Sequence, residues 1–167
     1  MIDCEGRRLR HELKYHLTFM QYRILRQKLK TVLKLDPHAG PDGRYHIRSL
    51  YFDDFKNTAY FDKAAGVPTR KKYRMRIYNV CDDFIKFERK NKFNEYVFKE
   101  TAVVSREEAD RILSGDVAFL ADSESQLLRC FYLECRRNLL HPVVLVYYLR
   151  EAYVHPVGDV RITFDID

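Results

Sequence analysis

The sequence has no tryptophan, only six glycines and only four cysteines, and each shortage excludes a class of protein. The glycines form neither a P-loop nor a G-x-G-x-x-G turn, so these two routes to ATP binding are excluded. The cysteines are too few and too scattered for a disulfide scaffold or a zinc knuckle. We therefore expect reduced thiols and a cytoplasmic location.

Long apolar runs are absent as well. No run reaches the roughly 18 residues that a transmembrane segment needs, and the first ten residues lack the apolar stretch of a signal peptide. No H-E-x-x-H motif or His/Cys cluster is present, which disfavours a zinc site. The sequence thus predicts no membrane span and no zinc enzyme.

The chain does have charge, aromatic residues and enough length for a core. Its 167 residues favour one domain over residues 1–167. Lys and Arg number 30 against 24 Asp and Glu, so the formal net charge is +6 and the binding partner is expected to be anionic. Twelve tyrosines and eleven phenylalanines predict an aromatic core or groove.

Hydrophobic periodicity predicts an α+β fold. Alternation of apolar and polar residues indicates about seven strands, joined mostly by short turns that favour antiparallel pairing. The predicted strands cover residues 8–17, 45–53, 70–79, 84–93, 96–104, 143–155 and 159–167. Capping boxes at Thr18/Gln21 and Ser105/Glu108 predict two helix starts, and the spacing of apolar residues predicts a longer helix over 122–140.

The polar faces of these strands are strongly basic. They contain Arg10, Lys14, Arg70, Lys72, Arg74, Arg76, Lys86, Lys90, Lys92, Lys99, Arg150 and Arg161, against Glu12, Glu88, Asp159, Asp165 and Asp167. An ordinary solvated sheet face would intersperse the signs, because like charges opposite each other destabilise a ladder. Strand faces that converge on a bound polyanion are the alternative, since the ligand would supply the missing negative charge.

The aromatic residues distinguish two kinds of polyanion. Nucleic-acid grooves place aromatic side chains among the basic residues for base stacking. Here Tyr73, Phe87 and Phe93 fall on the opposite, core-facing side. Tyr148 is the clearest aromatic residue on the basic side, and Tyr51 and Tyr78 are further candidates for it. This favours a phosphate chain, and we expect no nucleic-acid partner.

Six short motifs occur in order along the predicted strands. They are RHELKY (10–15), SLYFD (49–53), YRMRIY (73–78), FERK (87–90), YLREAY (148–153) and RITFD (161–165). Each motif alone is weak, but the ordered series resembles the VTC domain, the polyphosphate polymerase branch of the triphosphate tunnel metalloenzymes. The resemblance runs from about Arg10 to the end of the chain.

The resemblance implies an antiparallel β tunnel with flanking helices whose basic interior binds ATP, triphosphate and polyphosphate. It implies a metal-dependent transfer of the γ-phosphoryl group of ATP to a growing polyphosphate chain. Carried over by position, the catalytic residues would be Arg74, Arg76, Lys90, Arg150 and Arg161. The substrate-binding residues would be Lys14, Lys99 and Tyr148, with Lys72 and Lys86 added from the basic strand faces.

One departure from the family concerns the metal. In the family a later strand, reading like V-L-E-V-K, closes the tunnel and provides a glutamate ligand, and this sequence has no such segment. We therefore expect an unclosed sheet, in a domain that either is C-terminally incomplete or has lost this strand. Glu12, Glu88 and Asp165 could hold manganese or magnesium through oxygen. Pairing with Lys14, Lys90 and Arg161 is their alternative role.

Two further functions stay open at this point. A hydrolase of triphosphate or nucleoside triphosphates would use the same architecture, and a non-catalytic polyphosphate-binding module would explain the missing metal glutamate. A basic stripe over Arg23, Arg26, Lys28, Lys30 and Lys34 is typical of a solvated helix face. It is also compatible with docking to a membrane or to an acidic, membrane-associated partner protein.

Overall fold

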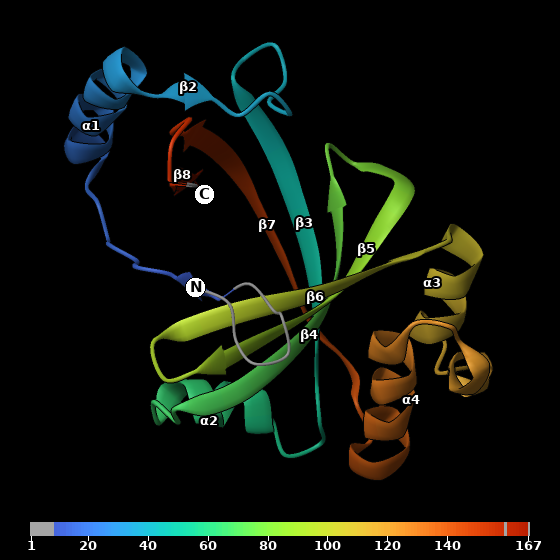
Figure 1. Cartoon of the computed structure of the whole chain (residues 1–167). Coiled ribbons are helices and arrows are strands. Elements are labelled where there is room, and N and C mark those ends of the chain that lie inside the picture. Colours follow the sequence, from blue (N-terminus) through green and yellow to red (C-terminus); the bar gives the residue numbers. More distant parts are fainter. Residues whose placement is uncertain (1–8, 159, 167) are drawn as a thin grey trace. The chain divides into compact units, whose positions relative to one another are not determined.

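A computed structural model describes residues 9–158 and 160–166 of the chain (Figure 1). Asp159 and Asp167, which the sequence analysis named, and Cys4, one of the four cysteines, lie outside the described residues. Within the described part, no helix is both long and apolar enough to pass through a bilayer.

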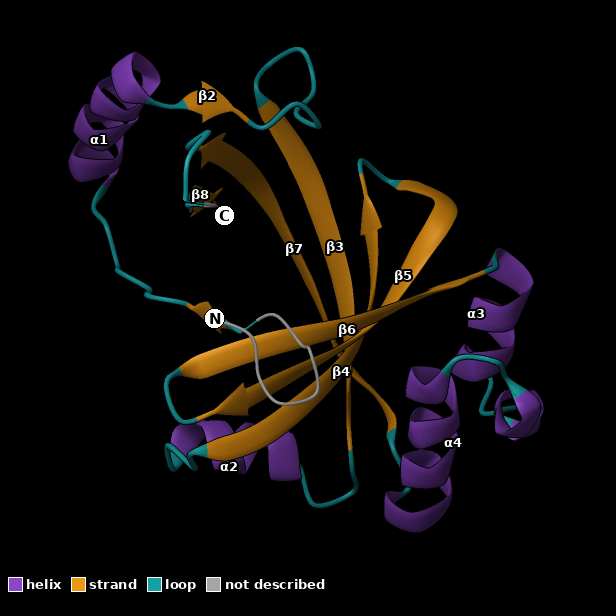
Figure 2. Cartoon of the chain, in the orientation of Figure 1, coloured by secondary structure: helices purple, strands orange, loops and turns teal. Residues whose placement is uncertain are grey.

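The described residues form both strands and helices (Figure 2). The strands are β1 (Arg10–His11), β2 (Lys34–Leu35), β3 (Arg44–Asp53), β4 (Thr69–Tyr78), β5 (Cys81–Phe93), β6 (Tyr96–Val104), β7 (His141–Val154) and β8 (Arg161–Ile166). The α-helices are α1 (Phe19–Val32), α2 (Thr58–Ala64), α3 (Arg106–Leu113) and α4 (Gln126–Asn138), with a 3₁₀ helix η1 at Ala118–Asp122.

The strands belong to one eight-stranded sheet. Its hydrogen-bonded order is β1-β6-β5-β4-β3-β7-β2, and β8 pairs with β7. The β1–β6, β5–β6, β2–β7 and β7–β8 ladders are antiparallel. The order begins at β1 and ends at β2, and among the described residues it does not return to its start. The predicted α+β class with an unclosed antiparallel sheet is therefore confirmed.

The described residues divide into two compact units, which are treated separately below. Unit 1 comprises residues 9–12, 49–77 and 81–146, and unit 2 comprises residues 13–48, 78–80, 147–158 and 160–166. Strands β3, β4 and β7 each contribute residues to both units.

An aromatic cluster forms the core of unit 1. Phe131 of α4 is fully buried, and its ring centroid lies 4.6 Å from Phe87, 5.0 Å from Phe52 and 5.3 Å from Tyr73. Helices α3 and α4 and η1 also contribute apolar side chains to this core. One face of the β4–β5 region is therefore committed to packing against helices, which leaves the other face for polar side chains.

The two predicted helix starts are confirmed. Thr18 accepts a hydrogen bond from the Gln21 backbone while the Gln21 side chain accepts one from the Thr18 backbone, and α1 follows. Ser105 and Glu108 form the same reciprocal pair before α3. Each box satisfies two backbone N–H groups that the first helical turn leaves without a partner.

Two predicted elements are shorter in the structure. The expected strand over 8–17 has only Arg10–His11 in a ladder, because His11 pairs with Tyr96, the residue at which β6 begins. The residues after His11 therefore have no residue of β6 to pair with. The expected helix over 122–140 is α4, which begins only at Gln126 and ends at Asn138, because Asp122 still belongs to η1 and the Ser123 hydroxyl accepts a hydrogen bond from the Ser125 backbone in between.

Candidate anion-binding site

In unit 1, strand alternation separates the charged side chains of β4 from its core residues. Tyr73 and Met75 are buried in the aromatic core. Lys72, Arg74 and Arg76 alternate with them and so point to the opposite face. The sequence pattern predicts the same division.

Glu88 of β5 lies among these cations and is fully buried. Arg74 donates from Nε to Glu88 Oε2 at 2.6 Å, and Lys99 of β6 donates from Nζ to Oε1 at 2.6 Å. One carboxylate therefore orients two basic side chains from neighbouring strands. Both cations retain further N–H donors that could bind an anion.

The charges of this group stabilise one another. Burial alone would raise the pKa of Glu88, but Arg74 and Lys99 outweigh it and hold that pKa below its ordinary value. Burial alone would lower the pKa of Arg74, but Glu88 and Tyr51 outweigh it and raise that pKa. Both side chains are therefore charged at neutral pH.

Two lysines of unit 1 lie directly opposite each other across a ladder. Lys90 of β5 is the register partner of Lys99 of β6. Such a like-charge pair destabilises a sheet unless negative charge is nearby. Lys90 pairs with Glu12 and Lys99 pairs with Glu88, so each ammonium group has one carboxylate partner. A bound polyanion would supply further negative charge at this point.

Arg76 and Lys72 extend the cluster along β4. Arg76 is buried, and its Nε donates to the hydroxyl of fully buried Ser49 at 2.8 Å. Burial lowers the pKa of half-buried Lys72, and the neighbouring charge of Lys63 adds to this effect. Lys86 lies opposite Val103 on the adjoining β5–β6 ladder.

Tyr51 joins the same cluster, although the resemblance assigned it no role. Arg74 donates from Nη1 to the Tyr51 hydroxyl at 3.1 Å. Burial alone would raise the Tyr51 pKa, but Arg74, Arg76 and Lys90 outweigh it and lower the pKa below its ordinary value. The sequence pattern made Tyr51 a candidate for the basic face, since it lies two residues after Ser49 on the same strand.

The lowered pKa of Tyr51 gives a spectroscopic test. An alkaline absorbance titration is expected to show one phenol ionising below pH 10, because nearby cations favour the phenolate. Tyr51→Phe should remove that step, whereas Tyr60→Phe, at a tyrosine that is 63% exposed, should leave it in place. A curve that is identical in the wild type and Tyr51→Phe would contradict the assignment.

Unit 2 contains a second basic cluster, on β7 and β8. Arg150 donates from Nε to Asp165 Oδ1 at 2.6 Å and from Nη2 to Oδ2 at 2.7 Å, which is a bidentate pair. Arg150 also donates to the Tyr148 hydroxyl at 3.1 Å. Arg150 and Asp165 are register partners, so the ladder itself brings them together.

Arg161 of β8 is held by two residues that sequence reasoning missed. Its Nη2 donates to Asp36, which is buried, and to the Tyr45 hydroxyl at 2.6 Å. Asp36 precedes Arg161 by 125 positions, and no local pattern in the sequence joins them. Lys14 also belongs to unit 2 and lies in the exposed segment between β1 and α1.

Comparison with known proteins gives a family match over nearly the whole chain. The VTC domain family matches residues 9–167. The chain belongs to the VTC domain family. No curated protein matches it.

Among solved structures, the VTC domain resembles the crystal structure of a candidate adenylate cyclase from Bacillus halodurans. The TM-score is 0.59 and the sequence identity 13%, over 96% of this chain and 73% of that chain. At this identity the likeness concerns the fold alone. It agrees with the predicted fold class.

The carboxylates considered as metal ligands have basic partners in this VTC domain. Glu12 pairs with Lys90, Glu88 with Arg74 and Lys99, and Asp165 with Arg150. Within residues 9–158 and 160–166, no three His, Cys, Asp or Glu side chains gather as a cation site. These carboxylates therefore do not fit a preassembled divalent-cation site.

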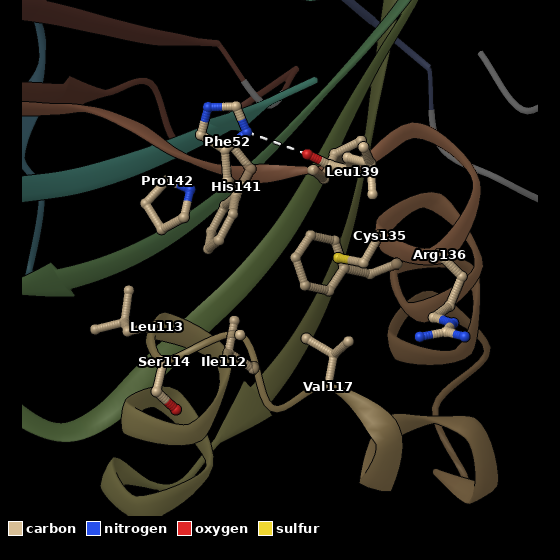
Figure 3. Close-up of a pocket in the computed structure, with 13 residues that line it drawn as sticks. Phe52, Ile112, Leu113, Ser114, Val117, Cys135, Arg136, Leu139, His141 and Pro142 are labelled. Carbon is tan, nitrogen blue, oxygen red and sulfur yellow. Dashed lines mark hydrogen bonds between the residues drawn. The ribbon is translucent and has the colours of Figure 1, made fainter. Parts of the chain in front are cut away.

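Unit 1 also contains a pocket lined by residues of α3 and α4, among others (Figure 3). It has a volume of about 390 Å³, and its lining is mostly apolar. Phe52, Ile112, Val117 and Leu139 are examples, and His141 hydrogen-bonds to the Leu139 carbonyl at 3.1 Å. Burial raises the pKa of the Cys135 thiol to about 12, so this cysteine stays protonated and unreactive.

Proposed function

We propose that this VTC domain transfers the γ-phosphoryl group of ATP to a growing polyphosphate chain. The observation that carries the proposal is the charged face of unit 1, where Arg74 and Lys99 share the buried carboxylate of Glu88. Membership of the VTC family supports it. The fold likeness to a candidate adenylate cyclase is consistent with a nucleotide substrate.

In this proposal the protein acts through alignment and charge. Phosphoryl transfer needs positioning and neutralisation of phosphate oxygens more than it needs a protein nucleophile. Arg74 and Arg76 would bind phosphate oxygens through their planar N–H groups, and Lys90 would add a point charge. Lys72, Lys86 and Lys99 would bind further phosphates along the chain.

The cluster of unit 2 is also proposed to bind phosphate. Arg150 and Arg161 would bind phosphate groups, with Tyr148 donating a hydrogen bond and Lys14 adding charge. Asp165 and Asp36 fix the directions of the two guanidinium groups. Their task is positioning, because each carboxylate already holds an arginine.

No step of this proposal depends on a divalent cation, because the described carboxylates do not form a site for one. The family resemblance implies manganese or magnesium, so the assay is run both with and without the cation. A requirement for either would be visible as loss of product in the presence of a chelator.

The proposal is tested by product analysis. The chain is incubated with ATP and manganese, and acid-resistant phosphate chains are measured. The double variant Arg74→Ala/Arg76→Ala should abolish product, because it removes two phosphate-binding cations from one strand. Arg136→Ala/Arg137→Ala removes two exposed cations of α4 and should retain activity. If this chain makes no polymer but a longer form that includes the closing strand does, the missing strand explains the difference. No polymer from the longer form either, or equal polymer from both double variants, would reject the polymerase.

Two other outcomes would point to other functions. Release of orthophosphate without chain growth would identify a hydrolase of triphosphate or nucleoside triphosphates. Salt-sensitive binding of tripolyphosphate without turnover, unaffected by chelator, would identify a polyphosphate-binding module. The pairing of all three candidate carboxylates with basic side chains favours the binding module as the second candidate.

A further inference from the structure

The segment from Leu13 to Leu35 in unit 2 is the most one-sided stretch of charge in the chain. It contains no Asp or Glu. Its basic residues are Lys14, Arg23, Arg26, Lys28, Lys30 and Lys34. Helix α1 makes up most of the segment, and none of its residues is buried. This helix therefore combines positive charge with an unusually exposed surface.

Two opposite rows run along α1. Tyr22, Arg26 and Leu29 are partly buried and form the row that faces the rest of unit 2. Met20, Ile24 and Lys28 follow one another at four-residue intervals and are exposed on the other side. Met20 is 61% exposed and Ile24 50% exposed, so the outward row offers apolar side chains to the surroundings.

The inward row fixes the helix in place. Arg26 donates from Nε to Glu151 Oε1 at 2.7 Å, and the Tyr22 hydroxyl donates to Oε2 at 2.9 Å. Glu151 is fully buried in β7. The outward row therefore lies on a helix that is already folded and held against β7. Docking would not include the free-energy cost of ordering this helix.

The mixture of outward side chains identifies the kind of partner. Phosphate chains would attract the cations but would gain nothing from exposed Phe19, Met20 and Ile24. A lipid surface with anionic headgroups interacts with both, since apolar side chains enter the acyl boundary while Lys and Arg remain among the headgroups. The same holds for the preceding segment, where Leu13, Tyr15 and Leu17 are exposed beside Lys14.

We propose that α1 docks this domain on an anionic membrane surface. Met20 and Ile24 would enter the bilayer boundary, and Arg23, Lys28 and Lys30 would contact the headgroups. The helix would lie in the plane of the interface, as basic amphipathic helices do. This proposal stands apart from the proposed polymerase activity, because Met20, Arg23, Ile24, Lys28 and Lys30 are not among the residues proposed to bind phosphate.

Vesicle sedimentation tests the proposal with the whole chain. Binding is measured to vesicles of phosphatidylcholine alone and to vesicles that also contain phosphatidylserine. The wild type is expected to prefer the anionic vesicles, and added salt should weaken binding. Arg23→Gln/Lys28→Gln should weaken it by about 30-fold, because each cation near an anionic surface contributes about a factor of five. Met20→Ser/Ile24→Ser should weaken it by about tenfold.

Matched controls locate the binding. Arg136→Gln/Arg137→Gln removes two exposed cations of α4 and should leave vesicle binding unchanged. Circular dichroism checks that every variant is folded. The proposal is overturned if Arg136→Gln/Arg137→Gln loses as much vesicle binding as Arg23→Gln/Lys28→Gln does. It is overturned as well if the two α1 variants bind vesicles like the wild type. It is also overturned if tripolyphosphate alone displaces the protein, or if Met20→Ser/Ile24→Ser changes the oligomeric mass in gel filtration, which would indicate a second copy as the occupant.

Discussion

Replacing Glu88 by alanine is expected to lower the free energy of unfolding by about 3–5 kcal/mol. Glu88 is fully buried, and its two oxygens accept hydrogen bonds from Arg74 and Lys99. The substitution would leave both cations without this carboxylate in a partly buried position. Urea denaturation of the wild type and the variant measures the difference.

The control for this prediction is Glu124→Ala, at an exposed glutamate of the same unit, which should change the stability by less than about 0.5 kcal/mol. Saturating tripolyphosphate should restore part of the loss in Glu88→Ala, because a bound anion supplies negative charge to the same cations. Equal stabilities of Glu88→Ala and Glu124→Ala would contradict the central role of the buried carboxylate.

The pH dependence of stability follows from the same group. The pKa of Glu88 is lower in the folded protein than its ordinary value, so its contribution is present above the ordinary pKa of about 4.3. That contribution is lost as the pH falls through the lowered folded-state pKa. Glu88→Gln should therefore have a flatter stability curve below about pH 4 than the wild type has.

The second large effect is expected at Glu151. This fully buried carboxylate accepts hydrogen bonds from Arg26, Tyr22 and Tyr153, and Arg44 Nε lies 3.6 Å from it. Glu151→Ala should cost about 3–5 kcal/mol, because it removes the shared partner of two arginines. The loss should appear in urea denaturation.

Helix α1 provides a second readout for Glu151. Because Tyr22 and Arg26 are its direct links to Glu151, the far-ultraviolet circular dichroism of Glu151→Ala should lose helical signal before the main unfolding transition. Tyr153→Phe removes one donor and keeps the charge, so it should cost only about 1 kcal/mol. A Glu151→Ala variant as stable as Tyr153→Phe would show that the carboxylate does not hold the helix.

Local patterns in the sequence predicted much of the fold. The period-two alternation of β4 placed Tyr73 and Arg74 on opposite faces, and the capping boxes placed the starts of α1 and α3. These features depend on residues within a few positions of one another, so a single sequence contains the whole signal. The family resemblance rested on the order of several such strands, and the match over residues 9–167 confirms it.

Other features depend on residues far apart in the sequence and had no local signal. The predicted strand over 8–17 is short because β6 begins at Tyr96, which the alternation of residues 8–17 could not indicate. The pairing of Arg161 with Asp36 likewise appears only once the chain is folded. The sequence indicated which side chains are basic and which face they share, and their part in phosphate chemistry stays a prediction.

One face of β4 and β5 packs against the core and the other contains the charged side chains, and this division has a consequence for how such a domain can evolve. The aromatic cluster around Phe131 stabilises unit 1 from one side, whereas Lys72 and Lys86 on the other side are only partly buried. Exchanging Lys72 or Lys86 for another polar residue would thus retune which anion is preferred at small cost to folding. A scaffold of this kind can diversify its ligands while its architecture is inherited unchanged.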